Sequence, residues 1–304
     1  MRLPLSMPES AAMAAYKAND EVLSMKQRFI TGAVATAILI PVLIFADTLA
    51  LPIGLAICSV IAVFEMIRCI GLQKAYVLNF PVYLAAGAFP FLVRYLEDLT
   101  LLRRAALVFS MVYLIYLFAV ATVSHGKYRI SDVCILFATS FYILVGFNAI
   151  ILLHDCEPGG NLSYLTIFIG AWITDIFAYL CGMLFGKGGK HKLIPDVSPK
   201  KTVEGSIGGT VFCTLCMLLY GIVLQNVTDV KVNFLMLAIA GVLAAVVAQI
   251  GDLLMSLIKR QYGIKDYGKI FPGHGGMLDR FDSILAVAII LLAFSSYFNI
   301  LEVI

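Results

Sequence analysis

Apolar runs of about 20 residues recur along this chain and constrain its fold more than any other feature. A helix that crosses a hydrocarbon core about 30 Å thick needs a run of that length. Hydrophobic residues make up 61% of the 304 residues and charged residues 13%, whereas soluble domains carry about 25% charged residues. Alternating ten-residue segments, the mark of a membrane β-barrel, are absent. We therefore expect an all-α polytopic membrane protein.

The apolar runs predict about nine transmembrane helices. They cover approximately residues 29–46, 49–67, 76–93, 105–123, 132–153, 162–185, 205–225, 232–251 and 283–301. Basic residues concentrate in cytoplasmic loops of membrane proteins, which sets the orientation. Residues 1–28, 68–75, 124–131, 186–204 and 252–282 hold every Lys and Arg except Arg94, Arg103, Arg104 and Lys231. This bias predicts a cytoplasmic N-terminus and a C-terminus outside, and a net charge of +3 is too small to indicate nucleic-acid binding.

Two of the predicted cytoplasmic loops carry an unusual density of polar groups. Residues 256–282, SLIKRQYGIKDYGKIFPGHGGMLDRFD, place five basic residues and three aspartates around a glycine-rich turn. Residues 186–205, GKGGKHKLIPDVSPKKTVEG, hold five lysines and four glycines. Lysines and close backbone approach at glycine suit phosphate binding. The alternative reading is an ordinary positive-inside loop that binds anionic lipid head groups.

Three carboxylates fall at or within the predicted spans: Glu65, Asp175 and Asp252. Each costs about 2.5–3.5 kcal/mol on insertion scales, so each is expected to face the bundle interior. Asp175 shares a predicted helix face with Tyr179 and two glycines, or is a hydrogen-bonded residue of a packing face. Glu65 has no such companions and is as well explained by a structural role.

The remaining aspartates suggest a cation. Asp252 is expected at the C-terminal, negative end of its helix, where a bound cation would offset the cost. Asp279 and Asp282 share a face if the last helix begins near Leu278, and that helix start would offer free N–H groups to an anion. Oxygen ligands without a His or Cys group favour Mg²⁺ or Mn²⁺. His274 is the candidate base, although its glycine neighbours equally suit a turn against a phosphate.

These polar positions resemble a known family. The run Ser256-x₂-Lys259-Arg260-x₄-Lys265-Asp266-x₅-Pro272-Gly273-His274-Gly275-Gly276-x₂-Asp279-Arg280-x-Asp282 is similar to the signature of phosphatidate cytidylyltransferases, also called CDP-diacylglycerol synthases. The segments around Asp175, Ser198–Gly205 and Gly251-Asp252 also resemble that family. The similarity is strong over residues 170–285, whereas residues 1–150 fit only in span count and general character.

The resemblance implies transfer of the cytidylyl group of CTP to phosphatidic acid, with release of pyrophosphate. It implies Mg²⁺ or Mn²⁺ as cofactor, with a monovalent ion such as K⁺ beside it, and a homodimer. Asp252 and Asp279 are then the expected metal ligands. The expected catalytic set is Lys259, Arg260, Lys265, Asp266, Arg280 and Asp282. The expected substrate-binding set is Asp175, Tyr179, Ser198, Lys200, Lys201, Gly273, His274, Gly275 and Gly276.

The predicted organisation is a cytoplasmic tail over 1–28, N-terminal transmembrane helices over 29–160 and a C-terminal catalytic transmembrane region over 161–304. Its loops 186–204 and 252–282 would form a cytoplasmic active site in a bacterial plasma membrane. One rival function is a CTP-dependent kinase of polyprenols or phytol, which would need a base to activate a hydroxyl group. The other is a lipid or ion transporter, which would carry its charges near the bilayer midplane on repeated halves.

Overall fold

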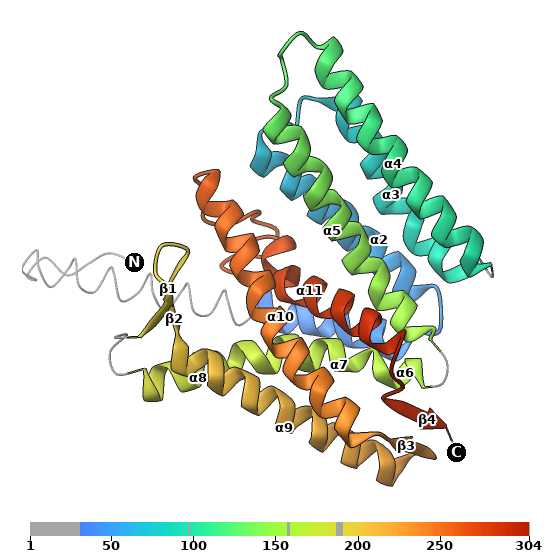
Figure 1. Ribbon diagram of the computed structural model, residues 1–304, viewed down its shortest axis with the longest axis vertical. Coiled ribbons are helices and arrows are strands. Elements are labelled where there is room, and N and C mark those ends of the chain that lie inside the picture. The colour runs from blue at the N-terminus through green and yellow to red at the C-terminus, as the bar shows by residue number, and fades with distance from the viewer. Residues whose placement is uncertain (1–30, 97, 157–158, 187–190, 304) are drawn as a thin grey trace, which may run out of the picture.

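The computed structural model describes residues 31–96, 98–156, 159–186 and 191–303. The predicted N-terminal tail and residues 187–190 of the first basic loop lie outside these ranges. In Figure 1 the helices are α2 (Ala50–Ile70), α3 (Tyr76–Tyr95), α4 (Leu99–Val123), α5 (Ile130–His154), α6 (Gly160–Ser163), α7 (Leu165–Phe168), α8 (Thr174–Phe185), α9 (Val203–Val227), α10 (Phe234–Gln261) and α11 (Leu278–Ser295). A π-helical turn, η1 (Ile169–Ile173), joins α7 to α8, and a further helix covers Thr31–Ile44.

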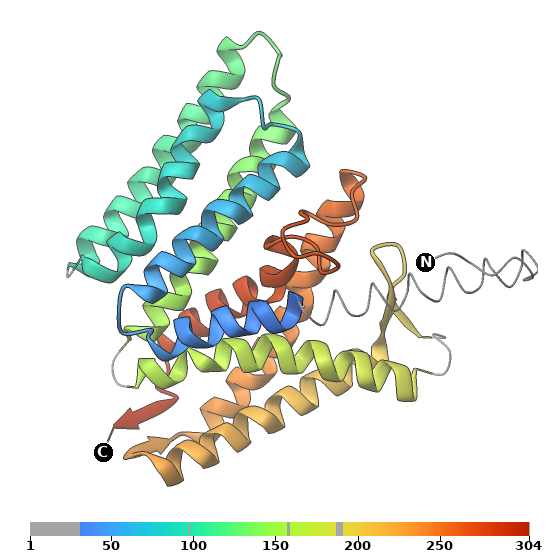
Figure 2. The ribbon, with the colours of Figure 1, turned by 180° about the vertical axis from the view of Figure 1, so that it is seen from behind.

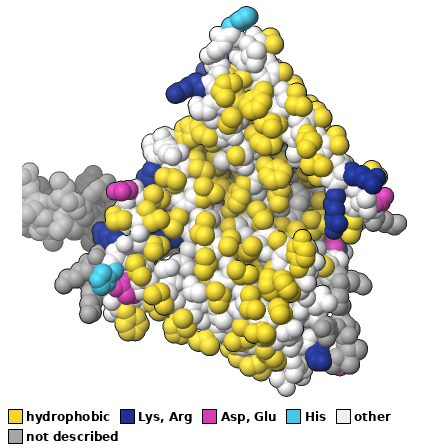
Figure 3. Space-filling model, in the orientation of Figure 1, with side chains coloured by type: hydrophobic (Ala, Val, Ile, Leu, Met, Phe, Trp, Pro, Cys, Tyr) yellow, Lys and Arg dark blue, Asp and Glu magenta, His cyan; other side chains and the backbone are white. Residues whose placement is uncertain are grey.

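Seven helical segments of the described chain are long and apolar enough to cross a membrane. They are 50–70, 76–95, 99–123, 130–154, 160–185, 203–227 and 234–261. Figure 3 shows apolar side chains over most of one face, with charged side chains near its margins. A surface of this kind suits contact with lipid, and the prediction of a multi-pass helical membrane protein is confirmed.

Each of the nine predicted spans coincides with a helix, but two do not meet the length and composition of a spanning segment. The described part of the first, Thr31–Ile44, is short, and α11 carries Asp279, Arg280 and Asp282 in its first two turns. The number of membrane crossings and the orientation of the termini therefore stay predictions.

Two predicted helix ends are wrong, in opposite directions. The span 232–251 continues as α10 to Gln261, so Asp252 lies well inside that helix and not at its negative end. The last helix begins near Leu278, as expected, but ends at Ser295. The longer α10 arises because hydropathy falls where a helix leaves lipid, whereas backbone hydrogen bonding continues until the sequence breaks it. Lys259 and Arg260 occupy the last turn of α10, where basic residues favour the helix dipole.

The helices form two groups that meet at α11. Figures 1 and 2 show α2 to α5 together on one side and α8, α9 and α10 on the other. The helix α11 packs against both α5 and α10. Gly146 of α5 permits the first contact, because a Cβ there would lie 2.8 Å from Leu285. The first two turns of α11 are thereby held between the two groups.

Small residues also bring α8 and α9 together. A Cβ on Gly209 would lie 2.8 Å from the Thr174 carbonyl oxygen, and one on Gly182 would lie 2.9 Å from the Thr202 hydroxyl. Close backbone approach at small residues is a common basis of helix association in membranes. Gly182 is one of the two glycines on the predicted Asp175 face, and it permits close approach to the start of α9.

Two short antiparallel sheets were not predicted. Strands β1 (Lys192–Ile194) and β2 (Ser198–Thr202) form a hairpin within the first basic loop, and β3 (Val230–Val232) pairs with β4 (Leu301–Val303). Thr202, the last residue of β2, caps α9 by accepting a hydrogen bond from Gly205 N at 3.1 Å. The hairpin therefore leads Lys200 and Lys201 directly into the start of α9.

Candidate active site

The two basic loops meet, as the sequence predicts. The Lys201 ammonium group at the end of β2 forms an ion pair with the Asp252 carboxylate on α10. Both side chains are partly buried. This contact joins the hairpin to the helix that leads into the 262–277 segment, so one site can draw groups from both loops.

A second contact brings α10 and α11 together at the same level. A Cβ on Gly251 would lie 2.6 Å from Ala286 and 2.8 Å from the Asp282 carbonyl oxygen. Because only glycine permits this approach, the adjacent Asp252 is carried toward Asp282. The carboxylates of Asp175, Asp252 and Asp282 lie within electrostatic range of one another. Three helices thus converge on one patch of negative charge.

The partners of these carboxylates leave part of that charge unmatched. Ser283 donates its backbone N–H to Asp282 Oδ1 at 2.9 Å and its hydroxyl to Asp175 Oδ2 at 3.3 Å. Lys201 pairs with Asp252, and the Asp175 side chain is exposed. Carboxylate oxygens are the ligands that Mg²⁺ prefers. One or two of these carboxylates could therefore contribute ligands to a divalent cation.

Within the part of the chain that the structure describes, no three acidic, His or Cys side chains are close enough to form a complete metal site. Mg²⁺ in phosphoryl-transfer sites is commonly bound through one or two carboxylates, with water and substrate phosphates as further ligands. The carboxylate patch suits that incomplete kind of site.

Asp279 has a different environment from the other aspartates. Its Oδ1 accepts a hydrogen bond from Lys259 Nζ at 2.7 Å, and its Oδ2 accepts from Tyr267 N at 2.8 Å and Gly276 N at 2.9 Å. The side chains of Asp279 and Lys259 are 4% and 11% exposed. Asp279 therefore fixes the glycine-rich turn and a buried lysine, and its role as a metal ligand stays a prediction.

The glycine-rich turn is closed by backbone bonds between Phe271 and Gly275. Phe271 N donates to Gly275 O at 3.0 Å, and His274 N donates to Phe271 O at 2.8 Å. Gly273 and Gly275 have φ values of 77° and 86°, a region that glycine adopts without strain. The half-buried His274 lies at the tip of this turn.

Tyr267 anchors the start of the segment that contains the turn. Its ring is 1% exposed, and its hydroxyl group donates to Met255 O at 2.9 Å. Burial raises the pKa of the Tyr267 phenol, which keeps it neutral and able to donate. The Lys259 ammonium group lies 5.3 Å from the ring centre. The sequence did not single out Tyr267, because one tyrosine in a tyrosine-containing loop carries no distinct signal.

The predicted anion site at the start of α11 is wrong. Met277 N and Leu278 N donate to the carboxylate of Glu65 on α2, at 3.0 and 2.8 Å. Gly276 N donates to Asp279. These N–H groups are therefore already bound to protein carboxylates. The only sequence signal for the contact between Glu65 and the start of α11 was the free-energy cost of burying a carboxylate in an apolar helix. That cost indicates that Glu65 has a partner but not which residues provide it.

Most of the other predicted site residues are exposed. Arg260, Lys265, Asp266, Arg280 and Lys200 are exposed, and Ser198 is half-buried at the start of β2. Tyr179 lies one turn along α8 from Asp175, with 69% of its side chain exposed. Arg280 lies within electrostatic range of Asp175. Exposed guanidinium and ammonium groups can receive a polyanion without displacing a buried partner.

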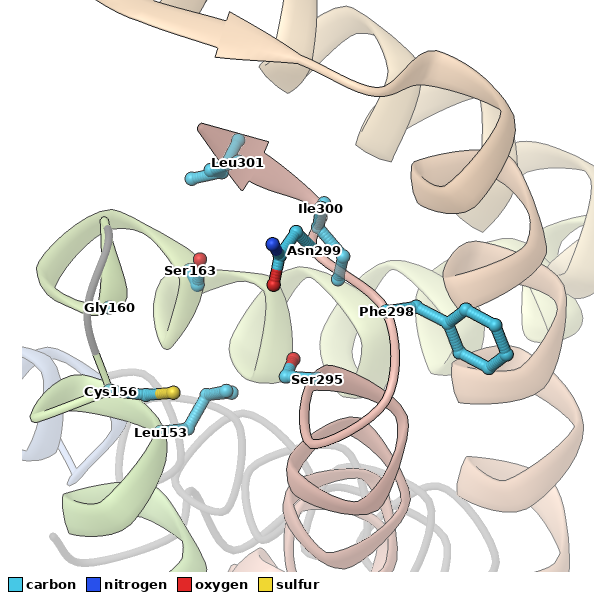
Figure 4. Close-up of a pocket in the computed structure, with 9 residues that line it drawn as sticks. All are labelled: Leu153, Cys156, Gly160, Ser163, Ser295, Phe298, Asn299, Ile300 and Leu301. Carbon is cyan, nitrogen blue, oxygen red and sulfur yellow. The ribbon is translucent and has the colours of Figure 1, made fainter. Parts of the chain in front are cut away.

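A small cavity lies far from this patch. Its volume is about 20 Å³, and it is lined by Leu153, Cys156, Gly160, Ser163, Ser295, Phe298, Asn299, Ile300 and Leu301 (Figure 4). Ser295 ends α11, about 20 Å along the helix from Asp282 at 1.5 Å per residue. With no charged side chain in its lining and room for about one water molecule, the cavity does not suit a nucleotide.

Comparison with known proteins agrees with the sequence signature. Residues 26–298 match the model of the cytidylyltransferase family. A phosphatidate cytidylyltransferase of Staphylococcus haemolyticus strain JCSC1435 is 30% identical over 269 residues, which are 86% of this chain and 96% of the relative. A phosphatidate cytidylyltransferase of Staphylococcus aureus strain COL is 32% identical over 271 residues, with the same two shares. The chain belongs to the cytidylyltransferase family. In this cytidylyltransferase the similarity therefore extends over the N-terminal helices, which lie outside the signature.

The buried turn of this cytidylyltransferase gives a stability prediction. A Cβ on Gly276 would lie 2.3 Å from Glu65 Oε1. We expect Gly276→Ala to lower the thermal unfolding midpoint of detergent-solubilised protein, because overpacking a buried site costs about 1–3 kcal/mol. Gly32→Ala is the matched control, since a Cβ there meets nothing within 4 Å. Equal midpoints for the two variants would contradict the tight fit around Glu65.

Proposed function

We propose that this cytidylyltransferase transfers the cytidylyl group of CTP to phosphatidic acid, giving CDP-diacylglycerol and pyrophosphate. Similarity to phosphatidate cytidylyltransferases along 86% of the chain carries the proposal. The contact between Lys201 and Asp252 supports it, because it joins the two basic loops beside a carboxylate patch. A lipid substrate explains why this charge lies on membrane helices rather than in a separate soluble domain.

In the proposed reaction an oxygen of the lipid phosphate attacks the α-phosphorus of CTP. The bond from that phosphorus to the bridging oxygen breaks, and pyrophosphate leaves with the electron pair. Phosphomonoesters lose their second proton near pH 6, so the nucleophile is already ionised at neutral pH. The reaction then needs charge neutralisation and in-line positioning more than a base, and we assign His274 to the turn against a phosphate.

The exposed basic side chains of the site, Arg260, Lys265 and Arg280, would bind the triphosphate or the lipid phosphate. Lys200 and Lys201 would hold the opposite side through the hairpin. Asp252 and Asp282 would bind a divalent metal ion, with Asp175 beside them and Asp279 orienting Lys259. When bound, that ion would neutralise triphosphate charge and stabilise the leaving pyrophosphate. Mg²⁺ is the first choice for these oxygen ligands, with Mn²⁺ second; an adjacent K⁺ and a homodimer stay predictions.

The orientation remains part of the proposal. The positive-inside bias would put both basic loops in the cytoplasm, where CTP is available, and the organisms of the relatives favour a bacterial plasma membrane. Cysteine labelling of Lys269→Cys from each side of sealed vesicles would test it. Lys269 is exposed and lies in the 262–277 segment.

The reaction type is tested with CTP labelled at the α-phosphate. We expect label to enter the lipid with equal release of pyrophosphate, because the cytidylyl group carries the α-phosphorus. Chelation of divalent ions is expected to stop the reaction, and added Mg²⁺ to restore it. Label that stays in CDP while the γ-phosphate enters an alcohol would instead support a CTP-dependent kinase. Binding of both substrates with no pyrophosphate release would contradict an enzyme of either kind.

A further inference from the structure

Glu65 is the most deeply buried acidic side chain among those that the structure describes, with 1% exposed. It lies in α2, more than 200 residues before its hydrogen-bond donors Met277 N and Leu278 N. Arg68, one turn further along α2, donates to the Tyr267 carbonyl oxygen. One face of α2 therefore binds both sides of the segment that carries the glycine-rich turn.

The segment is shaped around the Glu65 carboxylate. A Cβ on Gly268 would lie 1.9 Å from Glu65 Oε1, and one on Gly276 would lie 2.3 Å from it. Neither position has room for a side chain while Glu65 is present. The two glycines thus bring the backbone against the carboxylate from opposite sides of the turn.

Glu65 and Asp279 together bind four backbone N–H groups of this segment. Glu65 accepts from Met277 and Leu278, and Asp279 accepts from Tyr267 and Gly276. Three of these donors, Gly276, Met277 and Leu278, are consecutive in the chain and directly precede Asp279. The position of Asp279, and through it the ion pair with Lys259, therefore depends on where Glu65 holds the chain.

We propose that Glu65, assisted by Arg68, is a positioning residue for cytidylyl transfer. The inference rests on the proposed function and gives the N-terminal helices a part in it: α2 holds the glycine-rich turn and the first turn of α11 against α10. A carboxylate is required at this position because each of the two Glu65 side-chain oxygens accepts a hydrogen bond from a backbone N–H group. A glutamine offers one acceptor oxygen and turns an NH₂ group toward the other donor.

The test compares Glu65→Gln with Asp98→Asn in the full chain. Asp98 is the control because its carboxylate also accepts hydrogen bonds from two backbone N–H groups at a helix start, Thr100 N and Leu101 N of α4, at 2.8 and 3.0 Å. We expect Glu65→Gln to lower kcat about 10- to 100-fold with the KM for CTP within about threefold of wild type, because small misplacements of reacting groups reduce rate steeply. Asp98→Asn is expected to keep both constants.

Amide hydrogen exchange gives the readout that a change of stability alone would not produce. Glu65→Gln is expected to speed exchange in peptides covering 268–280, while peptides from α9 exchange as in wild type. An unchanged kcat, or a raised KM at constant kcat, would overturn the proposal, as would unchanged exchange in 268–280.

A second variant covers the case in which Glu65→Gln does not fold. Arg68 is exposed, so Arg68→Ala removes the contact with Tyr267 O without opening the core. We expect a kcat loss of about tenfold and faster exchange near Tyr267. If Arg68→Ala keeps wild-type kcat, the proposal fails. Wild-type protein assayed in parallel separates the two claims: inactivity with phosphatidic acid would refute the proposed function, while the exchange comparison would still decide whether Glu65 holds the turn.

Discussion

Asp282→Asn is expected to lower kcat by about 10²- to 10³-fold at saturating CTP and phosphatidic acid. Asp282 lies within electrostatic range of Asp175 and Asp252, which are on two other helices, and it accepts a hydrogen bond from the neighbouring Ser283 N–H. Losing this charge should weaken the hold on a divalent ion, so the Mg²⁺ concentration for half-maximal rate should rise. Initial rates of label transfer measured across a Mg²⁺ series give both quantities.

Asp229→Asn is the control for Asp282→Asn. Asp229 is an exposed aspartate beside β3, and its loss removes the same charge from the protein. Its kcat and Mg²⁺ dependence should equal those of wild type. If Asp282→Asn behaved in the same way, Asp282 would have no part in metal binding, and the carboxylate patch would be reduced to Asp175 and Asp252.

Asp279→Asn is expected to abolish turnover and to lower the thermal unfolding midpoint together. The Lys259 ammonium group is buried against Asp279, and removing one partner of a buried ion pair costs about 3–5 kcal/mol. The turn would lose its anchor at the same time, because Asp279 also binds Tyr267 N and Gly276 N. Thermal unfolding in detergent and the label-transfer assay measure the two effects.

The double variant Lys259→Met with Asp279→Asn separates pairing from chemistry. If the loss of stability comes from an unpaired lysine, the double variant should recover much of the midpoint, since an apolar side chain needs no partner. Activity should not recover, because the ammonium group is lost as well. A wild-type midpoint and turnover for Asp279→Asn alone would contradict the roles assigned to Asp279 here.

Sequence reasoning succeeded where a property is local or follows from the lipid environment. Apolar length identified the helical segments, and the loop signature identified the family. It failed where a helix outlasts its hydrophobic run. The prediction placed Asp252 at the end of a helix, but α10 continues to Gln261. The helix propensity of a residue does not depend on whether that residue lies inside or outside the lipid.

The partners of the carboxylates could not be predicted from sequence. Asp279 and Asp282 looked alike at a spacing of three, yet one binds Lys259 and the turn while the other faces the carboxylate patch. Glu65 seemed isolated because its donors lie more than 200 residues away. A charged residue in an apolar segment predicts that a partner exists, but the identity of the partner depends on how the helices pack.

The sequence by itself determined the class of protein, the helical segments and the family, because lipid exposure and a dense polar signature act locally. The tertiary structure alone decided which aspartates converge and what holds them. The close approach of α10 and α11 at Gly251 brings Asp252 toward Asp282. Glu65 of α2 accepts the hydrogen bonds of the N–H groups at the start of α11, which the sequence had suggested would bind a phosphate. Both results depend on the approach of distant helices, which is set by the shape of their packed faces.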